Sequence, residues 1–293
     1  MSDAESELKG KATTSDSAAE NTATESAGPI LTSDSDPAAE TSSAPRVRRL
    51  IGIEIVIVMA ISLGRSAVYS VISLIEKLTR PIPLNQQTTS MNNSATPDRP
   101  WLDLAYQVYY FILPLAEAAL ALYLLHLAWG QARRLIGFDL THFWRDLGKG
   151  LAICAVVGSV GIGWYLFAVW QGINTQVTAA NLTDVWWRIP ILLGSAAAAG
   201  ISEEVIMLGY LLTRLRDLKW NPWVALVFSA LIRGTYHLYQ GWGGAIGNLV
   251  MGLVFGYLYM RWKRVLPLVI AHFFMDAFAF VGYALLAPLV DWL

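Results

Sequence analysis

The chain has 293 residues, of which 55% are hydrophobic and only 15% are charged, and its mean hydropathy is +0.45. This balance is typical of a polytopic membrane protein rather than of a soluble domain. The formal net charge of −1 says little, because acidic residues gather in the first 45 residues and basic residues in the loops, but no strongly basic soluble stretch suggests nucleic acid. The single cysteine, Cys154, excludes a disulfide or a multi-cysteine metal site within the chain.

Residues 1–45 are rich in Ser, Ala, Thr, Glu and Asp and contain no aromatic residue. Such a composition cannot bury enough apolar surface to order itself, so we expect a disordered acidic tail. The segment lacks the basic start and short apolar core of a cleavable signal peptide. The first span is therefore expected to act as an uncleaved anchor.

Residues 46–293 are expected to form an all-α, polytopic transmembrane helical bundle. A helix needs ~20 mostly apolar residues to cross the ~30 Å hydrocarbon core of a bilayer. About seven apolar runs are candidates, and they lie near residues 50–78, 101–129, 150–171, 187–213, 222–240, 243–260 and 265–290.

The basic residues of the loops alternate in number from one loop to the next, which predicts the orientation. One set of loops carries Arg46, Arg48, Arg49, Arg133, Arg134, Arg145, Lys149, Arg214, Arg216, Lys219, Arg261, Lys263 and Arg264. The other set carries only Lys77, Arg80, Arg99 and Arg188. The N-terminus is therefore expected in the cytoplasm and the C-terminus outside, in a cell membrane that we expect to be bacterial. Residues 81–100 then form an exposed external loop.

Small residues recur at helical spacing on two of the predicted spans. Gly194, Ala198 and Ser202 share one face of the fourth span, and a second set, Gly244, Asn248, Gly252 and Gly256, shares one face of the sixth. Small residues at this spacing allow helix backbones to approach closely in a membrane. We interpret both faces as packing surfaces.

Two adjacent carboxylates, Glu203 and Glu204, interrupt a run that is otherwise apolar from Ile189 to Leu212. An ionised carboxylate at that depth costs at least ~2.5 kcal/mol, so the pair requires partners or a function. Neighbouring helical residues point ~100° apart, so the two side chains cannot be equivalent. One can face a site while the other pairs with a cation.

The later spans supply candidate partners. His272 and Asp276 stand four residues apart and so lie on one helical face, where they could be joint metal ligands, or Asp276 could orient the histidine. His237 is a second intramembrane imidazole, four residues after Arg233. Together with the two glutamates, these residues predict a single site built from three late spans.

These residues, in this order, resemble the CPBP family of intramembrane proteases, which contains the type II CAAX prenyl endopeptidases and the Abi-type proteins. The family pattern E-E-x-x-x-R, F-x-x-x-H and H-x-x-x-N/D is matched by Glu203-Glu204, His237 and His272-Phe273-Phe274-Met275-Asp276, within about residues 185–285. The chain departs from the pattern at two positions, because Leu208 stands in place of the family's arginine and Arg233 in place of its phenylalanine. We interpret this as relocation of the cation from one span to the next.

The resemblance implies an intramembrane endopeptidase acting on a membrane-associated peptide or protein. Glu203 or Glu204, with His237, would activate a water molecule, and His272 and Asp276 would stabilise the tetrahedral intermediate. A zinc or other divalent metal held by Glu204, His237 and His272 is the alternative, since histidine and carboxylate ligands with an open position suit zinc. Arg233 and Asn248 are expected to support the site.

Two other functions fit the same residues. The loss of arginine at Leu208 is compatible with a catalytically inactive membrane scaffold or bacteriocin-immunity protein. Intramembrane Glu, Asp and His side chains also build the proton relays of transporters. Transporters commonly contain two related halves, and the sequence shows no such repeat.

Overall fold

The computed structural model describes residues 37–287, with side chains from residue 45, and is helical apart from two three-residue strands. Contacts within the chain separate residues 1–42 from a second compact unit, residues 43–293. Most of the predicted acidic tail lies outside the described residues, although the first helix already begins at Pro37. The elements in chain order are α1 (Pro37–Ile61), α2 (Leu63–Leu78), η1 (Leu84–Gln86), β1 (Thr88–Ser90), α3 (Pro100–Trp129), α4 (Ala132–Leu135), α5 (Phe143–Trp170), β2 (Gln176–Thr178), α6 (Arg188–Glu204), the π-helix η2 (Val205–Leu211), α7 (Leu212–Asp217), α8 (Pro222–Tyr236), η3 (Leu238–Gln240), α9 (Trp242–Trp262) and α10 (Leu266–Leu286).

Five helical segments among the described residues are long and apolar enough to cross a membrane, namely α3, α5, the continuous segment from Arg188 to Asp217, α9 and α10. The pair α1–α2 makes up to six if it counts as one span bent by 52°. The chain is thus an all-α membrane protein. The predicted count of seven is not confirmed, because α8 has only 15 residues, or ~22 Å of helix, against the ~30 Å of the hydrocarbon core.

The bend between α1 and α2 has a local cause. The buried Ser62 hydroxyl donates to the Val58 carbonyl at 2.6 Å, in competition with the helix ladder. Gly64 follows two residues later and lies against the Met59 backbone, where a Cβ atom would not fit. Serine back-bonding and Ser/Gly pairs are recognised causes of helix kinks. The predicted run from 50 to 78 is therefore two helices.

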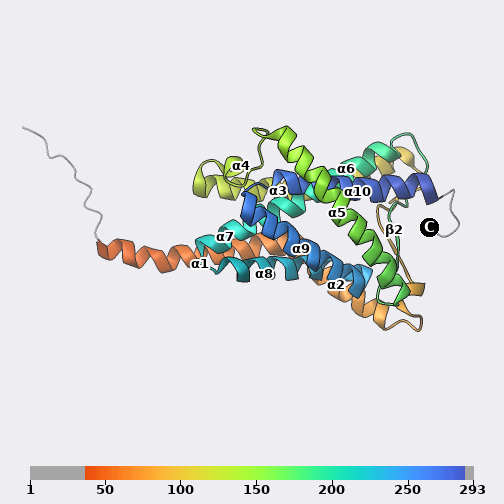
Figure 1. Ribbon diagram of the computed structural model, residues 1–293, viewed down its shortest axis with the longest axis horizontal. Coiled ribbons are helices and arrows are strands. Elements are labelled where there is room, and N and C mark those ends of the chain that lie inside the picture. Colours follow the sequence, from red (N-terminus) through yellow and green to blue (C-terminus); the bar gives the residue numbers. More distant parts are fainter. Residues whose placement is uncertain (1–36, 288–293) are drawn as a thin grey trace, which may run out of the picture. The chain divides into compact units, whose positions relative to one another are not determined.

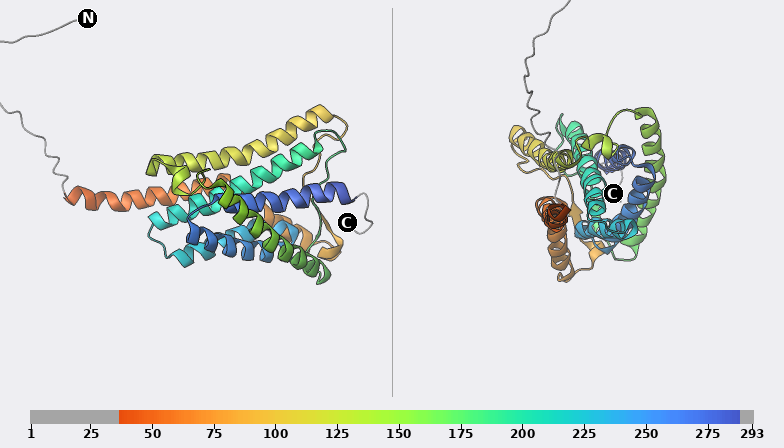
Figure 2. Two further views of the ribbon diagram at one scale, coloured as in Figure 1. Left: turned by 45° about the horizontal axis from the view of Figure 1, so that its top comes forward. Right: turned by 90° about the vertical axis from the view of Figure 1, so that its left-hand side faces the viewer.

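The helices of residues 43–287 pack in a connected series, and Figures 1 and 2 show their arrangement. Helix α6 lies between α3 and α10, α10 also contacts α5, and α5 contacts α9. Helix α9 packs on α8, and α8 packs on α2. The π-helix η2 is buried along its whole length and joins the main hydrophobic core.

The glycine face of α9 is confirmed as a packing surface. A Cβ atom on Gly252 would lie 3.1 Å from Ala230 Cα and from Arg233 Cδ, both on α8. Gly256 contacts Leu226, one turn closer to the start of α8. Larger residues on this face would hold α9 away from α8, as expected for small-residue interfaces in membranes. The close approach holds α8, which carries Arg233, against α9.

The predicted external loop is folded against a second loop. Strand β1 pairs with β2 in parallel, with Thr88 opposite Gln176 and Ser90 opposite Thr178. Its neighbour Thr175 donates through its backbone N–H to the Gln240 carbonyl at 2.9 Å, and Lys77 Nζ donates to the Tyr239 carbonyl at 2.8 Å. These bonds hold η3, which directly follows His237.

The opposite end of the bundle is fixed by an ion cluster. Arg264, between α9 and α10, donates from Nε to Asp146 Oδ2 at 2.8 Å and from Nη2 to Asp139 Oδ1 at 3.2 Å. Desolvation opposes ionisation of Asp139, but the bonds from Thr141 and Arg264 prevail and lower its pKa to about 2. This cluster anchors the start of α10. It also explains why α5 begins at Phe143, seven residues before the predicted run.

Candidate functional site

The site forms where the end of α6, the end of α8 and the middle of α10 meet. Gly200 makes this possible on α6, because a Cβ atom there would lie 3.1 Å from the Phe273 nitrogen and from the Val269 oxygen of α10. The small residue brings the two backbones together one turn before the glutamates. The side chains of Glu203 and Glu204 thereby reach residues of α8 and α10.

Glu204 is the most buried member of the cluster, with no exposed surface. Its Oε1 atom accepts hydrogen bonds from Arg233 Nη2 and from His272 Nδ1, the latter at 2.7 Å. Arg233 is itself 1% exposed. Burial of either charge alone would be strongly unfavourable, so each makes the burial of the other possible.

Glu203 has a different environment. Its side chain is 15% exposed, and its Oε2 atom accepts a hydrogen bond of 2.7 Å from the Tyr236 hydroxyl. Arg233 Nη2 lies 3.5 Å from the same oxygen. The two glutamates therefore share one cation, but only Glu203 has accessible surface. The predicted inequivalence of the pair is confirmed.

His272 connects two carboxylates. Its Nδ1 atom donates to Glu204, since a carboxylate oxygen paired with arginine acts as the acceptor. Its Nε2 atom lies 3.5 Å from Asp276 Oδ2, which is beyond the usual 2.7–3.2 Å of a strong hydrogen bond. The ring is thus oriented from both sides. Between the carboxylates of Glu204 and Asp276 the imidazolium form is favoured, and in that form Nε2 also carries a proton that it can donate to another acceptor. The predicted pairing of His272 with Asp276 on one face is confirmed.

His237 follows the last residue of α8 and lies beside the cluster. Its Nδ1 atom is 3.0 Å from the Arg233 carbonyl, and because a carbonyl only accepts, Nδ1 carries the proton. In the neutral ring, Nε2 is then the acceptor. The ring centroid lies 4.7 Å from that of Tyr236, whose hydroxyl bonds Glu203. The imidazole is thus linked to the two glutamates through Arg233 and Tyr236. The five residues predicted as catalytic are thus brought together.

The interpretation of Arg233 as a relocated cation agrees with its contacts. Its guanidinium forms ion pairs with both glutamates, and its Cζ atom lies 5.7 Å from the centre of the Phe255 ring. Leu208, at the position of the family's arginine, is 2% exposed within the hydrophobic core. The arginine that balances the two glutamates therefore comes from α8 and not from the segment that carries them.

Asn248 does not join the cluster through its amide. Within the part of the chain that the structure describes, its Nδ2 atom donates to the Gly244 carbonyl, one turn earlier on α9, at 3.0 Å. A supporting role for Asn248 stays a prediction.

Two features of the site were not predicted from the sequence. One is Tyr236, which binds Glu203; its position beside His237 was the available signal. The other is the π-helix directly after Glu204. Its residue Tyr210 donates to Glu54 Oε1 at 2.9 Å, and Arg214 forms a bidentate pair with Glu54 at 2.8 Å for both bonds. Short π-helical segments are frequent at functional sites, but hydrophobic spacing does not reveal them.

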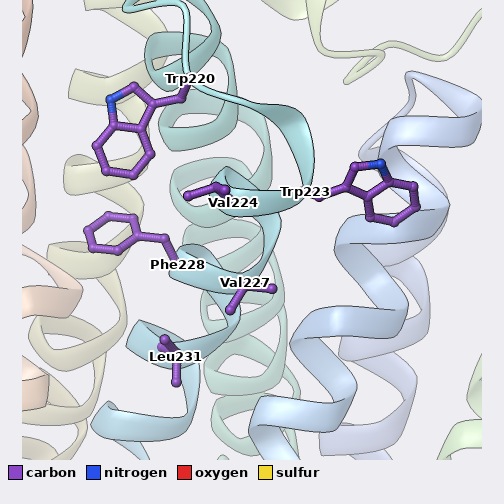
Figure 3. A pocket seen from close by; sticks show the side chains of 6 residues that line it. All are labelled: Trp220, Trp223, Val224, Val227, Phe228 and Leu231. Atoms are coloured by element: carbon purple, nitrogen blue, oxygen red, sulfur yellow. The ribbon is translucent and has the colours of Figure 1, made fainter.

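Surface pockets lie elsewhere. Figure 3 shows a cavity of about 430 Å³ lined by side chains of α8 and the preceding turn, namely Trp220, Trp223, Val224, Val227, Phe228 and Leu231. All six are apolar or indole side chains, and Trp223 and Val224 are 60% and 56% exposed. No acid, base or nucleophile is among these lining residues.

The residues predicted as metal ligands do not fit a metal. Within residues 45–287, no group of three or more His, Cys, Asp or Glu side chains is arranged to hold an ion. Glu204 Oε1 is engaged by a guanidinium and an imidazole N–H, and His237 Nδ1 faces a carbonyl. A dication at Glu204 would lie beside the buried positive charge of Arg233, which is electrostatically unfavourable.

Comparisons with known proteins bear on the same region. Residues 185–278, about a third of the chain, match the family model described as type II CAAX prenyl endopeptidase Rce1-like. Comparison with curated proteins and with solved structures found no match. The matched segment begins just before α6 and ends within α10, so it contains Glu203, Glu204, Arg233, His237, His272 and Asp276. The resemblance predicted from the three motifs is confirmed, because residues 185–278 are similar to the type II CAAX prenyl endopeptidase Rce1-like family.

Proposed function

We propose that the chain is an intramembrane endopeptidase that hydrolyses a peptide bond of a membrane-associated peptide or protein with a water molecule activated by side chains. The supporting observation is the unequal exposure of the two glutamates, 15% for Glu203 and 0% for Glu204. Water can approach the first and not the second. The Rce1-like match supports a hydrolase of this class.

In this proposal Glu203 is the general base. Its Oε2 atom is fixed by the Tyr236 hydroxyl, and its other oxygen is free to take a proton from water. His237 Nε2, an acceptor in the neutral ring, provides a second base on the same side. Removal of the proton makes the water nucleophilic toward the peptide carbonyl carbon.

His272 stabilises the oxyanion that forms when water adds to the carbonyl. Its Nε2–H is held near Asp276 at a distance too long for a strong bond, so a substrate oxygen can compete for it. Glu204 and Arg233 do not touch the substrate in this scheme. They position His272 and Glu203 and keep the local charge balanced in a low-dielectric environment, where preorganised donors are most effective.

Two conservative variants test the different roles proposed for Glu203 and Glu204. Glu203→Gln should lower peptide cleavage by ~10²–10⁴-fold with little loss of stability, because the amide oxygen can still accept from Tyr236 and Glu204 still balances Arg233. Glu204→Gln should also lower the free energy of unfolding by up to ~3–5 kcal/mol, because the buried Arg233 loses its closer counter-charge and keeps only Glu203, 3.5 Å away. Cleavage of a model membrane peptide in proteoliposomes and thermal unfolding in detergent measure the two effects.

The matched control is Glu117→Gln, which removes a glutamate of α3 whose partner Arg65 has a 63% exposed side chain. This variant should leave both peptide cleavage and thermal unfolding almost unchanged. Unchanged cleavage by Glu203→Gln would contradict the assignment of the base. An absence of cleavage by the unaltered protein on several membrane peptides would favour the inactive-scaffold alternative.

Relocation of the cation makes a second prediction. Arg233→Leu should abolish cleavage and reduce the free energy of unfolding by ~3–5 kcal/mol, because Glu204 loses its counter-charge. Adding Leu208→Arg to this variant should recover part of the cleavage and part of the lost stability, since position 208 lies one turn after Glu204 on the same segment. Arg65→Leu, on an exposed guanidinium, is the control. Failure of the double variant to recover either quantity would contradict relocation.

We further propose that the N-terminus is cytoplasmic and that the β1–β2 ladder is external, on the basis of the loop charges. In a Cys154→Ser background, a membrane-impermeant maleimide should label Ser90→Cys on intact bacterial cells. The same reagent should label Gln131→Cys, in the turn after α3, only after permeabilisation. The reverse pattern would contradict this orientation.

A further inference from the structure

A second cavity lies far from the paired glutamates in the sequence, at the end of α3. It has a volume of about 480 Å³, within the ~300–1,000 Å³ typical of ligand pockets. Its inner wall is formed by Ala119, Leu122, Tyr123 and His126, and its outer end by the turn after α3 and the start of α4. We call it the α3–α4 groove.

The inner wall is one face of a membrane-spanning helix. Positions 119, 122, 123 and 126 follow the i, i+3, i+4, i+7 spacing of a single helical face. Tyr123 is 57% exposed, so this face is turned away from the protein core. In a bilayer, the part of this face formed by Ala119, Leu122 and Tyr123 is therefore mostly apolar and exposed to lipid.

The outer end is built by a sharp turn. Gly130 closes α3 with φ of 76°, a value that favours glycine, and its N–H donates to the His126 carbonyl at 2.7 Å. The chain then reverses into α4, which carries Arg133 and Arg134. Both arginines line the groove at the end of the apolar face.

These two arginines differ from Arg214 and Arg264, which form ion pairs near the same membrane surface. Arg214 is paired with Glu54 and Asp217, and Arg264 with Asp139 and Asp146. In the described part of the chain, neither Arg133 nor Arg134 has a carboxylate within ion-pair distance, and the one side-chain bond is from Arg134 Nη1 to Gln131 Oε1 at 3.3 Å. The groove therefore ends in uncompensated positive charge.

We propose that the α3–α4 groove binds an anionic phospholipid of the bilayer. One acyl chain lies along Ala119, Leu122 and Tyr123, and the phosphate is held by Arg133 and Arg134. Guanidinium groups bind phosphate oxygens in bidentate fashion, and basic pockets beside transmembrane helices bind anionic head groups. The cavity in Figure 3 provides the contrast, because it is apolar throughout and has no charged residue in its lining.

The proposal is independent of peptidase activity and is tested on the full-length protein by native mass spectrometry from nanodiscs. The nanodiscs contain phosphatidylglycerol, phosphatidylcholine or an equal mixture. We expect selective retention of phosphatidylglycerol. The double variant Arg133→Gln/Arg134→Gln should weaken it by about thirtyfold, as expected for the loss of two arginines near an anionic surface.

The control Arg145→Gln/Arg261→Gln removes the same charge from exposed positions outside the groove and should leave retention unchanged. Ala119→Trp should reduce retention by filling the apolar half while the arginines remain. Thermal unfolding in detergent confirms that each variant is folded. Equal retention of both lipids, equal loss in the two double variants, or full displacement of the lipid by soluble glycerol phosphate would each overturn the proposal.

Discussion

The site depends on one interaction, the burial of Glu204 between Arg233 and His272. A carboxylate with no exposed surface at membrane depth needs a balancing charge and hydrogen-bond donors, which Glu204 receives at Oε1. Arg233 comes from α8 and His272 from α10, so three helices must approach closely. Gly200 and Gly252 allow that approach. The glycine contacts, the short α8 and the anchored start of α10 all maintain this contact.

The same interaction separates the roles of the two glutamates. Among the described residues, Glu204 Oε2 and Arg233 Nη1 are buried and have no hydrogen-bond partner. Both charged groups are therefore held away from water. Glu203 lies one residue earlier, keeps some exposed surface and is oriented by Tyr236. A fixed ion pair beside an accessible carboxylate provides a preorganised base, which is the arrangement that the proposed hydrolysis requires.

Much of this was predictable from residue types and spacing. The apolar runs predicted an all-α membrane protein, and the three motifs predicted that Glu203, His237 and His272 would lie together. The odd placement of an arginine at position 233, with a leucine at 208, indicated the source of the counter-charge. Each of these rests on an energetic rule, because an intramembrane charge needs a partner and that partner must lie within reach.

Other features were not predictable, for physical reasons. Helix α8 ends at Tyr236, and the η3 turn that follows is held by bonds from Lys77 and Thr175 to its carbonyls, contacts that do not alter the hydropathy of the run. The π-helix after Glu204 arises from tertiary contacts of Tyr210 and Arg214 with Glu54, which lie about 160 residues apart in the chain. The start of α5 reflects the pairing of Asp146 with Arg264.

The central claim is that side chains alone activate the water. The most direct measurement is cleavage of a membrane peptide by purified protein from which divalent metals have been removed by chelation, with residual metal determined by mass spectrometry. The account predicts that cleavage continues at an unchanged rate with less than one metal ion bound per chain. Loss of cleavage on chelation, with recovery when zinc is added back, would contradict it.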